Sequence, residues 1–257
     1  MIEIEALTKT YGGRPAVDGV TARFARGTLT AIVGSSGSGK TTLLRMINRL
    51  VEPSAGRVLI DGKDVARIPE VSLRQGIGYV IQGYGLFPHW TAARNIGVVP
   101  TLLGWPRARI KARTQELLHM LQLDPAEIGP RYPHQLSGGQ AQRIGVARAL
   151  AARPEVLLMD EPFGALDAMT RDDLNVELAR MWQETSKTVI FITHSISEAV
   201  FLADRVVMMS RGPGRIVDVF DVDLPRPRPL SVRESDAFGV YAQRIRHHFA
   251  ELGVVKE

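Results

Sequence analysis

A glycine- and serine-rich run between two apolar segments constrains the fold of this chain more than any other feature. The run is Gly34-Ser35-Ser36-Gly37-Ser38-Gly39-Lys40-Thr41-Thr42, which fits the pattern G-x-x-x-x-G-K-[ST]. The apolar residues 29–33 before it predict a short buried strand, and the apolar spacing in 42–48 predicts a helix. A strand, a turn and a helix in this order are the geometry that such a loop requires.

This run has the chemistry of a phosphate-binding loop. Glycines let backbone N–H groups approach an anion without a Cβ in the way, and a helix that begins near Gly39 directs its positive end at the anion. Lys40 adds a mobile charge, and the Thr41 hydroxyl is placed to ligate Mg²⁺. The alternative is a flexible linker, but linkers rarely lie between a strand and a helix with Lys and Thr in register.

A second apolar run ends in carboxylates. Residues 155–162 predict a buried parallel strand whose carboxyl end carries chemistry. We expect Asp160 to hold a metal ion through water, and Glu161 to orient and activate the hydrolytic water. Two acids at a strand end could instead cap the next helix, but that alternative loses weight because a phosphate loop lies upstream.

Leu136-Ser137-Gly138-Gly139-Gln140 lies between these two parts of the sequence, and the apolar residues of 141–150 after it recur as on a helix face. Ser137 and the glycine N–H groups at the start of such a helix would be presented to an anion. In motif order and spacing, the chain from Met1 to about Gly214 resembles the ATP-binding subunits of ABC transporters. In these subunits, the run from Leu136 to Gln140 corresponds to the signature sequence.

The resemblance implies an ATPase with ATP and Mg²⁺ as ligands, working as a homodimer or with a paired ATPase subunit. In the family the signature reaches the γ-phosphate of ATP bound by the partner, so a solitary copy should be nearly inactive. The implied nucleotide-binding residues are Tyr11, Gly34, Ser35, Ser36, Gly37, Ser38, Gly39, Lys40, Thr41, Thr42, Ser137, Gly138, Gly139, Gln140 and Asp167. The implied metal-binding residues are Thr41, Gln82 and Asp160.

Four of the expected site residues match the family by type and place. Tyr11 resembles the aromatic that stacks on adenine, and Gln82 resembles the glutamine that touches Mg²⁺ and the water. Asp167 resembles part of the loop that crosses the dimer seam, and His194 the histidine that hydrogen-bonds the γ-phosphate. With Glu161, Gln82 and His194 make up the expected catalytic set. The alternatives are a loop tyrosine over the core edge, an ordinary strand-end glutamine, a helix cap and a structural histidine.

The expected fold class is α/β, a P-loop NTPase core with a mostly parallel sheet, an antiparallel β flank and an inserted α-helical lobe. We expect a nucleotide-binding domain over 1–224, with a core lobe at about 1–88 and 153–224 and a helical lobe at about 89–152. Segments 2–6 and 20–25 should form the flank. Residues 225–257 should form an extended Pro/Arg connector, Pro225–Pro229, and a terminal amphipathic helix, Asp236–Leu252.

Composition limits the cellular setting. The chain has no cysteine, no apolar stretch near the ~20 residues that span a bilayer, and no secretory signal between Met1 and Ala25. We therefore expect a cytoplasmic protein, held at the inner face of the cell membrane through a partner. The net charge is +5, with many arginines near the C-terminus. We interpret these arginines as a solvated face, because acids are interleaved with them and no aromatic stacking platform accompanies them, and expect no nucleic-acid partner.

The expected partners are transmembrane permease subunits and, indirectly, a substrate-binding protein. Gly83–His89 resembles the loop that helps line the groove for a membrane-subunit helix, although Leu86 and Phe87 could instead pack inside the helical lobe. The runs 77–82, 85–89 and 95–100 are most similar to importers of glycine betaine, choline and carnitine. The tail instead resembles ATPases of nitrate, sulfonate and taurine importers. A soluble ABC ATPase acting on nucleic acid or ribosomes is a third possibility.

Overall fold

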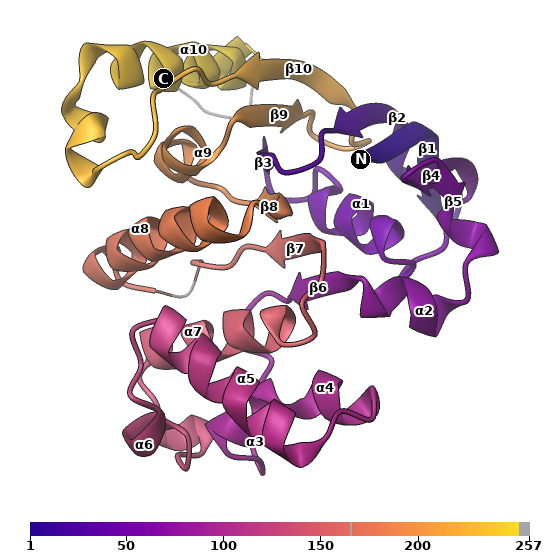
Figure 1. Ribbon diagram of the computed structural model, residues 1–257. Coiled ribbons are helices and arrows are strands. Elements are labelled where there is room, and N and C mark those ends of the chain that lie inside the picture. Colours follow the sequence, from indigo (N-terminus) through magenta and orange to yellow (C-terminus); the bar gives the residue numbers. More distant parts are fainter. Residues whose placement is uncertain (165, 252–257) are drawn as a thin grey trace.

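The computed structural model describes residues 1–164 and 166–251 of the chain. Its central sheet has the strand order β10-β9-β3-β8-β7-β6 (Figure 1). The strands from β9 to β6 are parallel, and β10 pairs with β9 in the antiparallel direction. The bounds are β3 Leu29–Gly34, β6 Ile77–Val80, β7 Val156–Asp160, β8 Thr188–Ile192, β9 Arg205–Met209 and β10 Ile216–Asp221.

A second, antiparallel sheet flanks the first and has the order β2-β1-β4-β5. It consists of β1 Ile2–Tyr11, β2 Arg14–Phe24, β4 Ala55–Ile60 and β5 Lys63–Asp64. The expected antiparallel flank is therefore confirmed. Its first two strands are longer than expected because they form a hairpin that pairs as far as Tyr11 and Arg14.

Helices cover both faces of the central sheet. The helix α1, Lys40–Ile47, packs with β1 and β2 against one face, while α8 Ala168–Thr185 and α9 Ile196–Leu202 pack against the other. Buried side chains of β7 alternate accordingly, with Leu158 facing α1 and Leu157 and Met159 facing the other core. Strands covered on both faces are apolar throughout, which explains the continuous apolar run of β7.

The helices between β6 and β7 form a lobe of their own at the bottom of Figure 1. Residues 91–150 contain no strand, and helices cover most of 91–123, where the apolar pattern predicted them. The helices are α3 Ala92–Ile96, α4 Val98–Leu102, α5 Arg107–Met120, α6 Pro125–Ile128 and α7 Gly138–Leu150, while α2 Glu70–Gln75 precedes β6. No helix within the described residues is long and apolar enough to cross a membrane. The lobe boundaries at 88 and 152, and the domain boundary at 224, stay predictions.

The C-terminal segment packs back onto the core. The helix α10, Asp236–Glu251, lies beside β10 and buries Phe238, Ile245 and Phe249 in the same core as α8 and α9 (Figure 1). These are residues that the amphipathic spacing predicted, and only Leu252 of the expected helix lies outside the described residues. The C-terminal segment is therefore anchored by apolar contacts.

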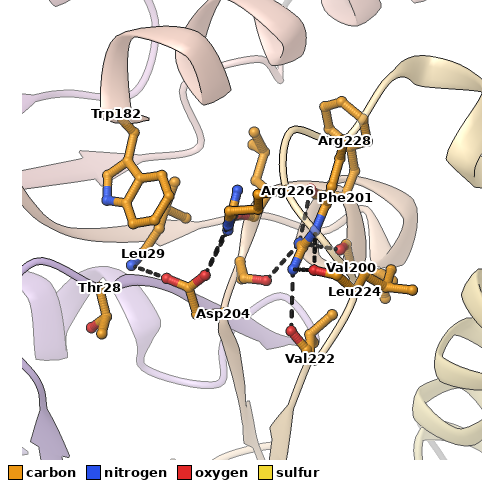
Figure 2. A network of polar contacts seen from close by, with 12 residues as sticks. Thr28, Leu29, Trp182, Val200, Phe201, Asp204, Val222, Leu224, Arg226 and Arg228 are labelled. Atoms are coloured by element: carbon orange, nitrogen blue, oxygen red, sulfur yellow. Dashed lines mark hydrogen bonds and ion pairs between the residues drawn. The ribbon is translucent and has the colours of Figure 1, made fainter. Parts of the chain in front are cut away.

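Expecting the C-terminal arginines to form a solvated face was wrong for three of them, Arg226, Arg228 and Arg233. Arg228 is 5% exposed, and its guanidinium donates to backbone carbonyls at the end of α9 and in the chain after β10 (Figure 2). The acceptors are Val200, Phe201, Ala203, Val222 and Leu224, at 2.8–3.3 Å. The neighbouring Arg226 lies over the Trp182 ring and pairs with Asp204 at 2.7 Å. Pro225–Pro229 is non-helical as expected, but it is docked against the core.

The physical reason is that a helix end and a non-helical segment both leave carbonyls without backbone partners. The last carbonyls of α9 need donors because no further helical turn follows. A guanidinium has five N–H donors in one plane, so Arg228 satisfies several of these carbonyls at once. Burial lowers the pKa of Arg228 to about 10, which still leaves it protonated at neutral pH.

Replacing Arg228 by Met should lower the free energy of unfolding by on the order of 3 kcal/mol, because several buried carbonyls lose their donors. Chemical denaturation of the full chain measures this change. Arg246→Met is the matched control, since Arg246 is exposed in α10, and it should change stability by less than about 0.5 kcal/mol. Equal effects of the two substitutions would contradict the role given to Arg228.

Candidate functional site

The expected site residues meet where neighbouring parallel strands end. β3, β8, β7 and β6 are consecutive in the sheet, so their carboxyl ends share one edge. The phosphate loop follows β3, Asp160 ends β7, and His194 and Gln82 come shortly after β8 and β6. In open α/β sheets this edge is where ligands bind.

The phosphate loop needs glycine at two positions with left-handed backbone. Gly39, with φ of 80°, is the N-cap of α1, and a Cβ there would lie 2.5 Å from the carbonyl oxygen of Ala16 in β2. Gly37 has φ of 79° and open space where a Cβ would project. The loop therefore turns tightly against the hairpin while its outer side stays open to an anion at the start of α1.

Lys40 is held inside this loop. Its side chain is 5% exposed, and its ammonium donates to the carbonyls of Gly34 at 2.9 Å and Ser35 at 2.8 Å and to the Ser38 hydroxyl at 3.3 Å. Burial lowers the pKa of Lys40, and the carboxylates of Glu161 and Asp160 oppose that shift. A buried cation with only carbonyl and hydroxyl acceptors is electrostatically suited to an anionic ligand.

Asp160 faces the same loop from β7. Its carboxylate accepts from the Thr41 hydroxyl at 2.9 Å and the Tyr79 hydroxyl at 3.4 Å, and the residue is 1% exposed. Burial raises its pKa above the ordinary value of 3.8. The sequence analysis did not predict a role for Tyr79, although Tyr79 has the only side-chain hydroxyl in the strand 77–80.

The oxygens of Thr41 and Asp160 fit Mg²⁺, which prefers oxygen ligands and commonly takes one or two carboxylates with substrate phosphates and water. Across residues 1–164 and 166–251, no three His, Cys, Asp or Glu side chains gather into a metal site. Gln82 contacts Glu161 instead of Asp160, and its metal role stays a prediction.

Glu161 joins the other two expected catalytic residues. One carboxylate oxygen accepts from the Gln82 amide at 3.0 Å, and the other contacts the Nε2 of His194. Glu161 has φ of 47°, an uncommon conformation for a residue with a side chain, and its N–H donates to Ile192 at 3.1 Å. Side chains from the segments after β6 and β8 thus converge on one carboxylate at the end of β7.

The signature lies at the start of α7, and its Ser137 is the N-cap. Ser137 and Gln140 satisfy each other's backbone N–H groups as a capping box, at 3.2 and 3.0 Å. The two glycines also have a packing reason, since a Cβ on Gly138 would lie 2.7 Å from the Tyr84 hydroxyl and one on Gly139 2.6 Å from Thr170. Ser137 is exposed, and within the described chain no hydrogen bond joins 136–140 to 34–42.

For Asp167 and Tyr11, the structure is compatible with the nucleotide-binding role and with the structural alternative. Asp167 is the N-cap of α8, accepting from the Thr170 N–H at 3.0 Å, and its carboxylate is exposed. Ala165, in the same expected loop, lies outside the described residues. Tyr11 ends β1, is 51% exposed, and has the Lys9 ammonium 5.1 Å from its ring centre. Its exposed ring is available for stacking, and the roles of both residues stay predictions.

In the expected docking loop, Gly83–His89, one of the two apolar residues in question is packed inside and the other is exposed. Leu86 packs against the core that the helical lobe shares with one face of the central sheet, whereas Phe87 is 40% exposed. The guanidinium of Arg148, in α7, donates to the Gly85 carbonyl at 2.7 Å. This long-range contact ties the loop to the signature helix, and no local sequence pattern indicated it.

Comparison with known proteins identifies the family. Residues 17–164 match the family model described as ABC transporter. The chain belongs to the ABC transporter family. A dimeric structure of the ATP-binding cassette MJ0796 in a post-hydrolysis state, bound to ADP and Pi, shares the fold with a TM-score of 0.78. It is 31% identical and covers 88% of this chain and 100% of its own.

Two similar relatives have names that refer to quaternary amines. The choline transport ATP-binding protein OpuBA of Bacillus subtilis is 52% identical over 82% of this chain and 56% of its own length. The glycine betaine uptake system ATP-binding protein YehX of Escherichia coli is 49% identical over 82% of this chain and 68% of its own length. The chain thus spans little more than half the length of the first of these relatives.

The raised pKa of Asp160 gives a prediction with a definite sign. Because the folded state disfavours the ionised carboxylate, Asp160→Asn should raise the free energy of unfolding at neutral pH. The gain should shrink as the pH is lowered through the raised folded-state pKa, and it should be lost below the unfolded-state pKa of 3.8. Thermal unfolding across this pH range measures it.

The same substitution should weaken Mg²⁺-dependent ATP binding, which isothermal calorimetry measures. Thr41→Ser, which keeps the hydroxyl, is the control and should bind ATP like the wild type. An Asp160→Asn protein that is less stable than the wild type at neutral pH would contradict the electrostatic argument.

Proposed function

We propose that this ABC family chain is the ATP-hydrolysing subunit of an importer for quaternary amine osmoprotectants such as glycine betaine, choline and carnitine. The observation that carries the ATPase part is the convergence of Gln82 and His194 on Glu161, beside the phosphate loop. A carboxylate held between an amide and an imidazole at this edge is placed to orient and activate a water.

The other residues of the site then divide the binding of ATP among them. Residues 34–42 hold the phosphates with backbone N–H groups and Lys40, and the Tyr11 ring stacks on the adenine. Thr41 and Asp160 would hold Mg²⁺, which would supply charge neutralisation of the phosphates when bound. Glu161 accepts the proton of the attacking water, and His194 hydrogen-bonds the γ-phosphate and positions that water.

Two copies, or this chain and a paired ATPase subunit, close around two ATP molecules. Ser137, Gly138, Gly139 and Gln140 of one chain complete the phosphate site of the other, with Asp167 at the seam. The exposure of Ser137 at the start of α7 supports this pairing. Closure would move the docked permease subunits, and hydrolysis would release the pair.

The substrate class rests on the similarity to OpuBA and YehX, whose names refer to choline and glycine betaine. The chain would act at the cytoplasmic face of the membrane, bound to permease subunits that receive cargo from a substrate-binding protein. Nitrate, sulfonate or taurine remains the alternative cargo. Transport by the complex reconstituted in liposomes decides between them, since uptake of taurine without uptake of choline or glycine betaine would overturn the proposed class.

Replacing Glu161 by Gln should leave ATP binding within about threefold of the wild type while turnover falls by at least about 100-fold, because the base is lost and the shape kept. Phosphate release and nucleotide binding are measured on the same preparation. Glu155→Gln is the matched control, since Glu155 is an exposed acid just before β7, and its turnover should be that of the wild type. Rapid phosphate release by Glu161→Gln would remove Glu161 from its role.

A further inference from the structure

A buried polar pair lies directly beside His194. The Thr193 hydroxyl contacts a carboxylate oxygen of Glu198, and the two residues are 4% and 5% exposed. The same hydroxyl accepts from the Ser195 N–H at 3.0 Å, so its own proton is directed at Glu198. The Ser195 hydroxyl in turn accepts from the Glu198 N–H at 3.2 Å as the N-cap of α9.

These contacts hold the backbone on both sides of His194. On one side, the Thr193 N–H donates to the Ile32 carbonyl at 3.2 Å, which joins it to β3. On the other side, the Ser195 N–H is fixed by the Thr193 hydroxyl. The imidazole therefore projects from a short segment whose two neighbours are both anchored, and Glu198 is the acceptor that completes the anchor.

Arg171 of α8 connects this pair to a second loop. Its guanidinium lies 3.6 Å from the other carboxylate oxygen of Glu198 and donates to the Leu166 carbonyl at 2.7 Å. Leu166 directly precedes Asp167, the N-cap of α8. One guanidinium thus spans the distance between the segment that carries His194 and the start of α8.

The pair belongs to the wall of the active-site cavity. A cavity of about 320 Å³ is lined by Glu161, His194, Arg171 and Glu198, among others. Burial raises the pKa of Glu198, and its hydrogen bond with Thr193 and the charge of Arg171 oppose that shift. A buried carboxylate is costly unless it is paired, so its position beside the cavity needs an explanation.

We propose that Glu198 is a positioning residue, which through Thr193 holds His194 against Glu161 and through Arg171 couples His194 to the loop at Leu166 and Asp167. The catalytic part of this inference rests on the proposed ATPase function, whereas the coupling between the two loops does not. Glu198 touches neither nucleotide nor water in this role. It acts by fixing the two segments that do.

Hydrogen–deuterium exchange on the nucleotide-free chain tests the coupling. Thr193→Val keeps the volume but removes the hydroxyl, and exchange of the peptide covering Leu166–Thr170 should become at least about threefold faster. Thr193→Ser keeps the hydroxyl and should restore the wild-type rate. Unchanged exchange at Leu166–Thr170 in Thr193→Val would overturn the coupling, whatever the chain's activity.

Steady-state ATP hydrolysis tests the positioning of His194. Thr193→Val and Glu198→Ala should each lower kcat by about tenfold with KM for ATP changed by less than about twofold, and Thr193→Ser should recover kcat. The double variant should be no worse than either single variant, because both break one anchor. Wild-type kcat in Thr193→Val would overturn the positioning role.

Asp204→Asn is the control for loss of stability. Asp204 pairs with Arg226 just beyond the other end of α9, so this substitution perturbs the same helix without touching Thr193, Glu198 or Arg171. It should lower the melting temperature and leave kcat unchanged. If the wild type does not hydrolyse ATP in the reconstituted permease complex, the proposed function fails and the exchange experiment alone decides the inference. If the wild type hydrolyses ATP and Asp204→Asn loses kcat as Thr193→Val does, the inference fails alone.

Discussion

The parallel pairing of β3, β8, β7 and β6 is the constraint on which the site depends. Because these strands are neighbours and run the same way, segments from four distant parts of the sequence end at one edge. The register pairs Asp160 with Ile192 and Val80 with Met159, which fixes the residues that lie at that edge. The positions of Gln82, Asp160, Glu161 and His194 follow from that register.

The same edge carries an electrostatic cost that the rest of the fold offsets. Lys40, Asp160 and Glu198 are buried ionisable groups. Burial lowers the pKa of Lys40 and raises the pKa of Asp160 and of Glu198, so it disfavours the charged form of each. Their hydrogen-bond partners lie on different elements, such as Thr41 for Asp160 and Thr193 for Glu198. Stability and function thus oppose each other at this edge, as is common for binding sites whose charges await a ligand. The apolar faces of α1, α8 and α9 supply the burial that makes the arrangement stable.

Much of the fold and site could be predicted because the signals were local. The run 34–42 lies between a continuous apolar run and a segment with helical apolar spacing, and the apolar strand of 156–160 ends in acids. Both halves of the site could therefore be located from the sequence. The helix over 236–251 followed from its apolar spacing in the same way. Each of these depends on neighbours within a few residues, which a single sequence displays directly.

What the sequence did not reveal depends on contacts between distant segments. Arg228 was expected in solvent because acids are interleaved with the C-terminal arginines and no aromatic platform accompanies them. Three of its acceptors, however, lie more than twenty residues away, at the end of α9. Glu198 lies only four residues after His194, but its role could be inferred only from its contacts with Arg171 and Thr193. Leu86 is packed against the core and Phe87 is exposed. This difference could not be predicted, because a loop has no repeating pattern of buried and exposed positions.

The most direct test of the pairing of two chains is a crosslink, and the absence of native cysteine makes it clean. Chains carrying Ser36→Cys and differently tagged chains carrying Ser137→Cys, both in the Glu161→Gln background, are mixed and treated with a short bismaleimide. With saturating ATP, the account predicts a dominant product joining one kind of chain to the other, and little of it without ATP. Products that join only like chains, or a yield that ignores ATP, would contradict the claim that each chain completes the other's phosphate site.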